Sequence, residues 1–147
     1  MLLTIIASLF KSWFVIQKKK INFEVFKVNI KSILQTMKIP FQTIDWSSVP
    51  KTEHKGENGS AYWQTMQYPG LRVRIVEYTK GYLADHWCRK GHIVHCLEGS
   101  FVSELEDGQK FTLTKGSTYV VSDDLSSHRS ISKEGVKLMI IDGDFLK

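Results

Sequence analysis

Residues 81–99 hold three of the five histidines and both cysteines of this chain. His86 and Cys88 are two positions apart, so on an extended strand their side chains point to the same face. A short turn separates them from His92, which begins a second, apolar strand. If the two strands lie side by side, these three side chains can converge on one point. Imidazole nitrogen and thiolate sulfur are ligands for zinc, iron and copper, so this stretch predicts a metal site.

A fourth candidate ligand, His128, lies far along the chain in a polar segment. Together with His86, Cys88 and His92 it would hold one divalent metal ion. Because a thiolate is a soft ligand, we expect zinc or iron rather than magnesium or calcium. Two alternatives for Cys88 stay open, a reactive thiol and a buried neutral one. We expect Cys96 to be a small buried hydrophobe.

The remaining histidines have simpler interpretations. His95 is one residue out of phase with His92, so it should point outward, to the surface or to a dimer contact. His54 lies in a polar stretch that we expect to be a solvated loop. If that loop folds over the mouth of a barrel, Glu53 and His54 become candidates for proton transfer or for orienting a ligand.

Two arginines alternate with apolar residues in the stretch 71–79. Arg72 and Arg74 are most simply the polar face of a strand. If that face turns into a barrel, one of them can bind the carboxylate of a substrate. Asp123 and Asp124 follow a later strand, and we expect them to form a solvated turn.

The net charge of +5 is confined to the first quarter of the chain. Residues 1–36 hold six lysines and one glutamate, whereas residues 37–147 hold fourteen basic and fourteen acidic side chains. The larger part has no basic surplus to meet phosphates, so we expect no nucleic-acid partner. With 42% apolar and 24% charged residues, the composition excludes collagen-like, disordered and multi-pass membrane proteins.

The first residues are apolar but do not resemble a spanning helix. Residues 1–16 are shorter than the ~20 residues that such a helix needs, Lys11 interrupts them, and no signal-peptide cleavage site follows. Residues 18–34 mix lysines with apolar side chains, as surface-bound helices do. Residues 1–36 are therefore either a leader outside the fold or a membrane anchor. We expect a cytoplasmic protein with one domain at 37–147, which contacts a membrane only if the first segment is an anchor.

From Met37 onward the pattern is typical of antiparallel β-structure, with turn residues at short intervals and no capped helical period. Pro69-Gly70 and Asp107-Gly108 have the composition of tight turns, and we expect another turn at 98–100. Val136–Ile141 is the most apolar stretch and should be a central strand. The other expected strands are 60–67, 71–79, one around His86, 92–97, 101–106, 110–114 and 117–121. Many short strands without helices predict a sandwich or a barrel.

The spacing around His86 resembles the first motif of the cupin superfamily, whose members are small jelly-roll barrels that hold one metal ion. That motif runs Gly, five residues, His-x-His, three or four residues, Glu, six residues, Gly. His86, Cys88, His92 and Gly99 reproduce its spacing. Cysteine stands in place of the second histidine, and histidine stands in place of the glutamate. Gly81 is one residue closer to His86 than the motif asks.

The second cupin motif runs from a glycine, through a Pro-x-Gly loop, to one histidine. Gly116 and His128 match its ends, with one extra residue between them. Residues 39–147 resemble more narrowly a group of small single-domain cupins with an Asp-His-Cys-Trp motif, here Asp85-His86-Trp87-Cys88. The resemblance implies an all-β, single jelly-roll barrel with residues 1–36 outside it. The metal ligands that it implies are His86, Cys88, His92 and His128.

The same resemblance implies two classes of function, and the sequence leaves both open. The first is a mononuclear metalloenzyme that acts on a small polar molecule, of the dioxygenase, isomerase or lyase type. The second is a non-catalytic barrel that binds or senses a small ligand, with a structural metal or none. A site with all four ligands would be closed, as structural zinc sites are, whereas an open position would favour catalysis. Cupins of this size often pair, so a homodimer is expected.

Overall fold

Nine strands and two short 3-10 helices make up residues 38–147, the part of the chain that the computed structural model describes. The two interpretations of residues 1–36 concern a segment outside these described residues. The 3-10 helices are η1 (Trp46–Ser48) and η2 (Asp144–Leu146). The strands are β1 (Lys51–Lys55), β2 (Ser60–Tyr68), β3 (Leu71–Tyr78), β4 (Tyr82–Leu83), β5 (His92–Leu105), β6 (Lys110–Thr114), β7 (Thr118–Val121), β8 (His128–Ser132) and β9 (Val136–Gly143). The all-β prediction is confirmed, and within the described part no helix is long and apolar enough to cross a membrane.

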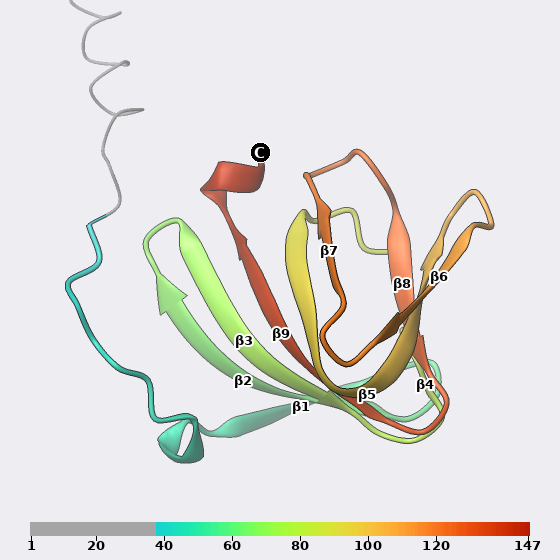
Figure 1. The fold of residues 1–147 in the computed structure, drawn as a ribbon, viewed down its shortest axis with the longest axis horizontal. Helices are drawn as coiled ribbons and strands as arrows, with labels where there is room; N and C mark the ends of the chain where they lie inside the picture. Colours follow the sequence, from blue (N-terminus) through green and yellow to red (C-terminus); the bar gives the residue numbers. More distant parts are fainter. Residues whose placement is uncertain (1–37) are drawn as a thin grey trace, which may run out of the picture. The chain divides into compact units, whose positions relative to one another are not determined.

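All strand pairs are antiparallel, and hydrogen bonds join the strands in the order β1-β2-β3-β9-β5-β8-β4. The first half of β5 pairs with β9 and β7, and its second half pairs with β8 and β6. This long strand therefore belongs to both layers. Figure 1 shows the sheet curling around β5, with β2, β3 and β9 on one side and β6, β7 and β8 on the other. The result is an open-sided barrel of the jelly-roll type.

Strand β9 alternates along its whole length between buried and half-buried residues. Its buried positions are Val136, Leu138, Ile140 and, unexpectedly for an acid, Asp142. Because β9 lies between β3 and β5, the prediction of a central strand is confirmed. The buried apolar cluster that it joins contains Ala61, Val76, Tyr82, Val94, Cys96, Phe101, Leu113, Val136, Leu138 and Ile140. Cys96 is fully buried within it, as a small hydrophobe should be.

Strand β5 runs without interruption from His92 to Leu105, so the turn expected at 98–100 is wrong. These residues continue the strand, and a bulge lies just before them, because the pairing with β9 shifts register between Cys96 and Glu98. Gly99 has a φ of 78°, a left-handed conformation that side chains with a Cβ disfavour. The glycine therefore bends the strand from one layer into the other rather than ending it.

The replacement Gly99→Ala should lower the free energy of unfolding by about 2–3 kcal/mol, since the left-handed conformation alone costs about 1–2 kcal/mol. The added Cβ would also lie 2.8 Å from the carbonyl oxygen of Gly135. Gly108→Ala is the matched control, because its φ is 91° but no atom lies within 4 Å of the added Cβ. Urea unfolding of both variants measures the difference, and equal losses would show that the close approach to Gly135 has no energetic weight.

His54 lies in β1, so the loop expected there is wrong. Pairing with β2 fixes this strand, and the ring of His54 lies 3.9 Å from the ring of Trp63. Glu53 accepts a hydrogen bond from the hydroxyl of Ser60 at 2.8 Å. Neither Glu53 nor His54 lines the cavity at the metal centre described below. The strand thus keeps both side chains away from the position in which they would transfer protons.

Candidate metal centre

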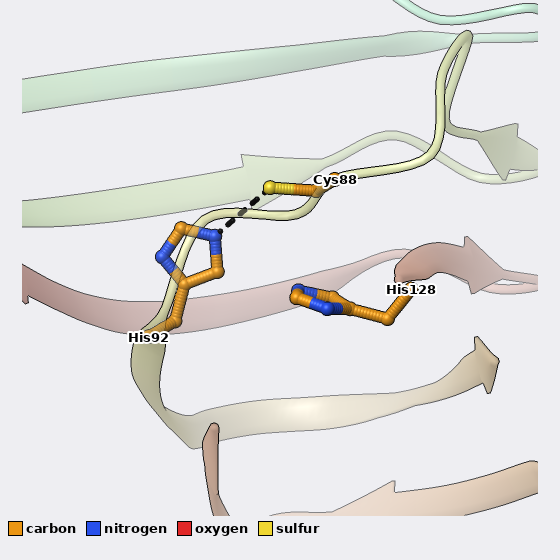
Figure 2. A group of neighbouring side chains, drawn as sticks. All are labelled: Cys88, His92 and His128. Carbon is orange, nitrogen blue, oxygen red and sulfur yellow. Dashed lines mark hydrogen bonds between the residues drawn. The ribbon is translucent and has the colours of Figure 1, made fainter. Parts of the chain in front are cut away.

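Cys88, His92 and His128 come from three separate segments and point toward one another, as Figure 2 shows. Their possible ligand atoms all lie within 4.8 Å of one another. His92 is the first residue of β5, and His128 is the first residue of β8. Cys88 lies between β4 and β5 and is joined to His128 by two backbone hydrogen bonds, of 2.8 and 3.0 Å. The fold therefore brings together three of the four predicted ligands.

His86 is not part of this group among the residues that the structure describes. The strand expected around it does not form, because β4 covers only Tyr82–Leu83 and the chain bends at Asp85 and His86. The His86 side chain is 70% exposed, and its Nδ1–H donates to the Asp85 carboxylate at 2.6 Å. The expectation that His86 and Cys88 share one face of a strand is wrong. His86 lines the nearby cavity without joining the cluster.

The tautomer of His128 is fixed by a backbone carbonyl. Its Nδ1 lies 2.9 Å from the carbonyl oxygen of Ser126, which can only accept, so Nδ1 carries the hydrogen. The lone pair is therefore on Nε2, where a metal ion can be bound. Burial, the largest influence, and the nearby His92 lower the pKa of His128, although the Ser126 carbonyl opposes them. The imidazole is consequently neutral near pH 7, as a ligand must be.

His92 lies between a thiol and a carboxylate. Its Nε2 is 3.3 Å from the sulfur of Cys88, and its Nδ1 is 3.6 Å from Oδ2 of Asp142. The second separation is longer than a hydrogen bond, so we treat it as an attraction between charges. Burial alone would lower the pKa of His92, but Asp142 and Cys88 together raise it. A carboxylate behind a histidine in this way orients the ring of metal-binding histidines.

The thiol of Cys88 is made more acidic by its neighbour. Burial alone would raise the pKa of Cys88, but the hydrogen bond and the charge of His92 outweigh it and lower the pKa. Without a metal, the two shifts both favour sharing of one proton between the Cys88 sulfur and Nε2 of His92. A metal ion would replace the shared proton between them, because both the thiolate and the neutral imidazole are ligands.

Asp142 is the functional candidate that the sequence analysis missed. It is 4% exposed and lies on β9 directly opposite Arg72 of β3. Arg74 donates to its Oδ2 at 2.6 Å, and Arg72 donates to Oδ1 at 3.0 Å. Burial would raise the pKa of Asp142, but His92 and the two arginines hold it well below its usual range. A signal was present in the sequence, since Asp142 continues the alternation that buries Val136, Leu138 and Ile140.

The arginine face of β3 turns inward, contrary to its simplest interpretation as a solvated face. Arg74 is 3% exposed, and its guanidinium carbon lies 4.5 Å from the centre of the Trp63 ring. This stacking and the pairing with Asp142 hold the charged group inside the barrel. The alternative stated for these arginines, a face that turns into a barrel, is therefore the arrangement that the structure has.

A cavity of about 210 Å³ lies against the cluster inside the barrel. Its lining includes all three clustered side chains together with Arg72 and Arg74. Most of the remaining lining is aromatic or apolar, and it includes Trp63, Tyr78, Tyr82, Tyr119, Val94, Leu138 and Ile140. A larger and more apolar cavity, of about 440 Å³, lies between β6 and β7 and shares only Tyr119 and His128 with the first. We assign the chemistry to the smaller cavity because the polar groups converge there.

The loop that carries Cys88 is held in place by an acid expected to be solvated. Asp123 accepts hydrogen bonds from the backbone N–H of Gly91 at 2.6 Å and from Lys90 at 2.7 Å. The turn expected at Asp123 and Asp124 forms, and Asp124 is exposed, but the Asp123 side chain is partly buried and paired rather than solvated. His95 meets its expectation, since it points away from the core and its ring nitrogen lies 2.8 Å from the Thr118 hydroxyl.

The number of protein donors bears on whether a metal site here would be closed or open. Zinc takes four ligands in structural sites, and catalytic sites have three protein ligands and one position for water or substrate. Because His86 lies apart, Cys88, His92 and His128 supply three donors beside a cavity. Two imidazoles and a thiolate suit zinc or iron. The cluster is therefore a possible metal site with room for a small molecule.

The sequence matches no protein-family model and no curated protein. Among solved structures, the chain is similar to a sugar phosphate isomerase of the cupin superfamily from Silicibacter pomeroyi. The identity is 12% and the TM-score 0.57, covering 69% of this chain and 75% of that one. It is also similar to an RmlC-like cupin from Shewanella frigidimarina NCIMB 400, with 18% identity and a TM-score of 0.55, covering 74% of this chain and 94% of that one. A third similar structure is ectoine synthase from P. lautus, with 14% identity and a TM-score of 0.57, covering 70% of this chain and 78% of that one. At such identities the likeness is one of fold.

Proposed function

We propose that this protein, which has the cupin fold, binds one zinc or iron ion through Cys88, His92 and His128 and acts as a metalloenzyme on a small polar molecule. The observation that carries the proposal is the convergence of three ligand atoms within 4.8 Å at the wall of a cavity. An isomerase and a synthase among the structural neighbours support catalysis in a barrel of this kind. The reaction would be of the isomerase, lyase or dioxygenase type.

The side chains present fit a metal ion in three respects. His128 has its Nε2 lone pair free because Nδ1–H donates to Ser126. His92 has a carboxylate behind it, at the ring nitrogen remote from Cys88. The pKa of Cys88 is lowered by His92, which favours the thiolate form that binds zinc and iron. A bound ion would supply Lewis-acid polarisation of an oxygen of the substrate.

The chain's own residues would do the rest of the work. Trp63, Tyr78 and Tyr119 would form an aromatic wall along one part of the cavity. The hydroxyl of Tyr119 stays protonated because burial raises its pKa, so it would position a substrate through a hydrogen bond rather than transfer a proton. Asp142 holds the ring of His92 and the two arginines in fixed positions.

Cobalt substitution of the full-length protein tests the proposal. The protein should bind one equivalent of Co²⁺. Its spectrum should then show a thiolate-to-cobalt charge-transfer band that Cys88→Ser removes. Azide should change its visible spectrum, because an open coordination position accepts a small anion. His95→Ala is the matched control and should leave the spectrum unchanged, since His95 points away from the core.

Two results would contradict the proposal. One is a metal content well below one equivalent that does not change when Cys88 or His128 is replaced. That result would favour the alternative, a barrel that binds or senses a small ligand without turnover. One equivalent of metal with a spectrum that azide does not change would indicate a closed, structural site.

A further inference from the structure

The wall of the metal-centre cavity carries positive charge without a lining carboxylate. Four cationic side chains line it, Arg72, Arg74, Lys90 and Arg129. No aspartate or glutamate lines it among the residues that the structure describes. The acids that balance these cations stand behind the wall, as Glu104 does for Arg129 at 2.6 Å. A molecule inside the cavity therefore meets the cationic side of each pair.

The charges of Arg72 and Arg74 are only partly balanced by the acid behind them. Arg72 and Arg74 share the single carboxylate of Asp142, so the three groups together carry one positive charge. The Arg74 side chain is only 4% exposed, and water cannot screen it. Burial first, and the charge of Arg72 second, lower the pKa of Arg74, although Asp142 opposes this. An anion in the cavity would offset a buried charge that the protein leaves uncompensated.

Two residues that line the same space carry buried donors without a partner. These are Nε of Arg74 and Nε1 of Trp63, neither of which has a hydrogen-bond acceptor within the described residues. Tyr82 lines the cavity as well, and burial raises its pKa, so its hydroxyl remains a donor. Buried donors without partners are unfavourable, and a ligand rich in acceptors relieves them.

The size of the cavity restricts the ligand. Its volume of about 210 Å³ is below the ~300–1,000 Å³ of pockets for drug-sized molecules. At ~30 Å³ for each water in the liquid, it corresponds to roughly seven waters. Arginine forks match carboxylates and phosphates bidentately, and of these two groups the planar carboxylate is the smaller.

We propose that the natural ligand of this cavity is a small organic carboxylate, with its carboxylate directed to Arg72 and Arg74 and its other end directed to Cys88, His92 and His128. The inference rests on the proposed function in its choice of site, and it adds the class of substrate. It does not require the metal for the carboxylate end, because the charge excess at Arg72, Arg74 and Asp142 exists without one.

The test is calorimetric titration of the full-length protein, zinc-loaded and zinc-free, with malonate and succinate. Their uncharged diamides, malonamide and succinamide, are the matched probes. At least one dicarboxylate should bind both forms of the protein, and more tightly to the zinc-loaded form. Neither diamide should bind measurably. Zinc content is determined on the same samples.

Three variants assign the binding to the arginine pair. Arg72→Gln, whose side chain is one-third exposed and should not prevent folding, is expected to weaken dicarboxylate binding at least about tenfold. Asp142→Asn removes the competing carboxylate, so it should tighten binding at least about threefold. These opposite signs separate ligand binding from a general loss of structure. Lys115→Gln, an exposed residue on the turn after β6, is the charge-matched control and should bind as the wild type does.

The inference would be overturned if the diamides bound as well as the dicarboxylates. Absence of dicarboxylate binding in both the wild type and Asp142→Asn would overturn it too, as would equal affinities of wild type and Arg72→Gln. A different result would contradict the proposed function alone. In that case zinc would not bind, but the zinc-free protein would still bind a dicarboxylate, and Arg72→Gln would still weaken this binding. Stoichiometric zinc without carboxylate selectivity would instead retain the metal site and reject the ligand class.

Discussion

Replacing His128 with alanine should weaken zinc binding by the full-length protein well beyond the roughly 10- to 100-fold that outer partners of a metal site contribute. The change removes the one ligand whose lone pair is already fixed on Nε2 by the Ser126 carbonyl. It leaves only two protein donors, Cys88 and His92, beside the cavity. Competition with a zinc chelator at pH 7.5 measures the affinity, and elemental analysis after dialysis measures the retained metal.

His86→Ala is the matched control for that result. It also removes a histidine that motif spacing predicts to be a ligand, but one that lies outside the cluster in the structure. His86 is 70% exposed and pairs with Asp85, so its removal should leave zinc affinity within about threefold of the wild type, because such exposed pairs contribute little. Loss of zinc in His86→Ala equal to that in His128→Ala would show that the loop 84–91 closes over the metal. The site would then have four ligands and no open position.

Zinc affinity should also fall as the pH is lowered from 8 to 6. Both the thiolate of Cys88 and the neutral imidazole of His92 are needed for binding, and protons compete for them. The pKa of His92 is raised, so its proton is lost only at higher pH than for an ordinary histidine. The chelator competition, repeated between pH 8 and pH 6 on the wild-type protein, measures this decrease in zinc affinity.

The replacement Asp142→Ala should reduce the free energy of unfolding by about 3–5 kcal/mol at pH 7, the usual effect of breaking a buried ion pair from one side. It leaves the guanidinium of Arg74, 4% exposed, without its partner, and it removes the partner of Arg72. Urea unfolding of the zinc-free protein measures the loss without a contribution from the metal. Glu134→Ala is the matched control, since its pair with Lys80 is three-quarters exposed on both sides and should contribute little.

The acid side of the stability profile supplies a second measurement on Asp142. Its pKa in the folded protein is held well below the ordinary value of about 4 that it has in the unfolded chain. A depressed carboxyl pKa stabilises the fold at pH values above the unfolded pKa, and the stabilisation is lost as pH falls toward the folded pKa. Wild-type stability should therefore decrease below about pH 4, and Asp142→Ala should decrease less over this range. Parallel profiles would mean that Asp142 is not ionised in the folded state.

Local patterns were sufficient for most of the architecture. Alternation and turn residues predicted strands at β2, β3, β6, β7 and β9, because strand period and tight turns depend on residues close in sequence. The hydrophobic excess of Val136–Ile141 placed β9 at the centre. Motif spacing selected Cys88, His92 and His128, which meet in the structure.

Other features depend on contacts between distant segments, and local sequence could not supply them. A Glu-Gly-Ser stretch has the composition of a turn whether it ends a strand or bends it, and only the pairing of β5 with both layers makes it part of a continuous strand. The direction of His86 follows from a bend between β4 and the Cys88–His128 bridge. Neither feature has a signature within its own few residues.

The charged interior of the barrel is the clearest case. Arg72 and Arg74 alternate with apolar residues, and that alternation is the same whether their face meets water or the barrel cavity. The register of β3 with β9 places Asp142 opposite Arg72, and this pairing makes the inward face tolerable for two arginines. Residue types and spacing thus determined a β-barrel with a soft-ligand cluster. The direction of each charged side chain was determined by strand pairing, because burial of a charge depends on a partner seventy residues away.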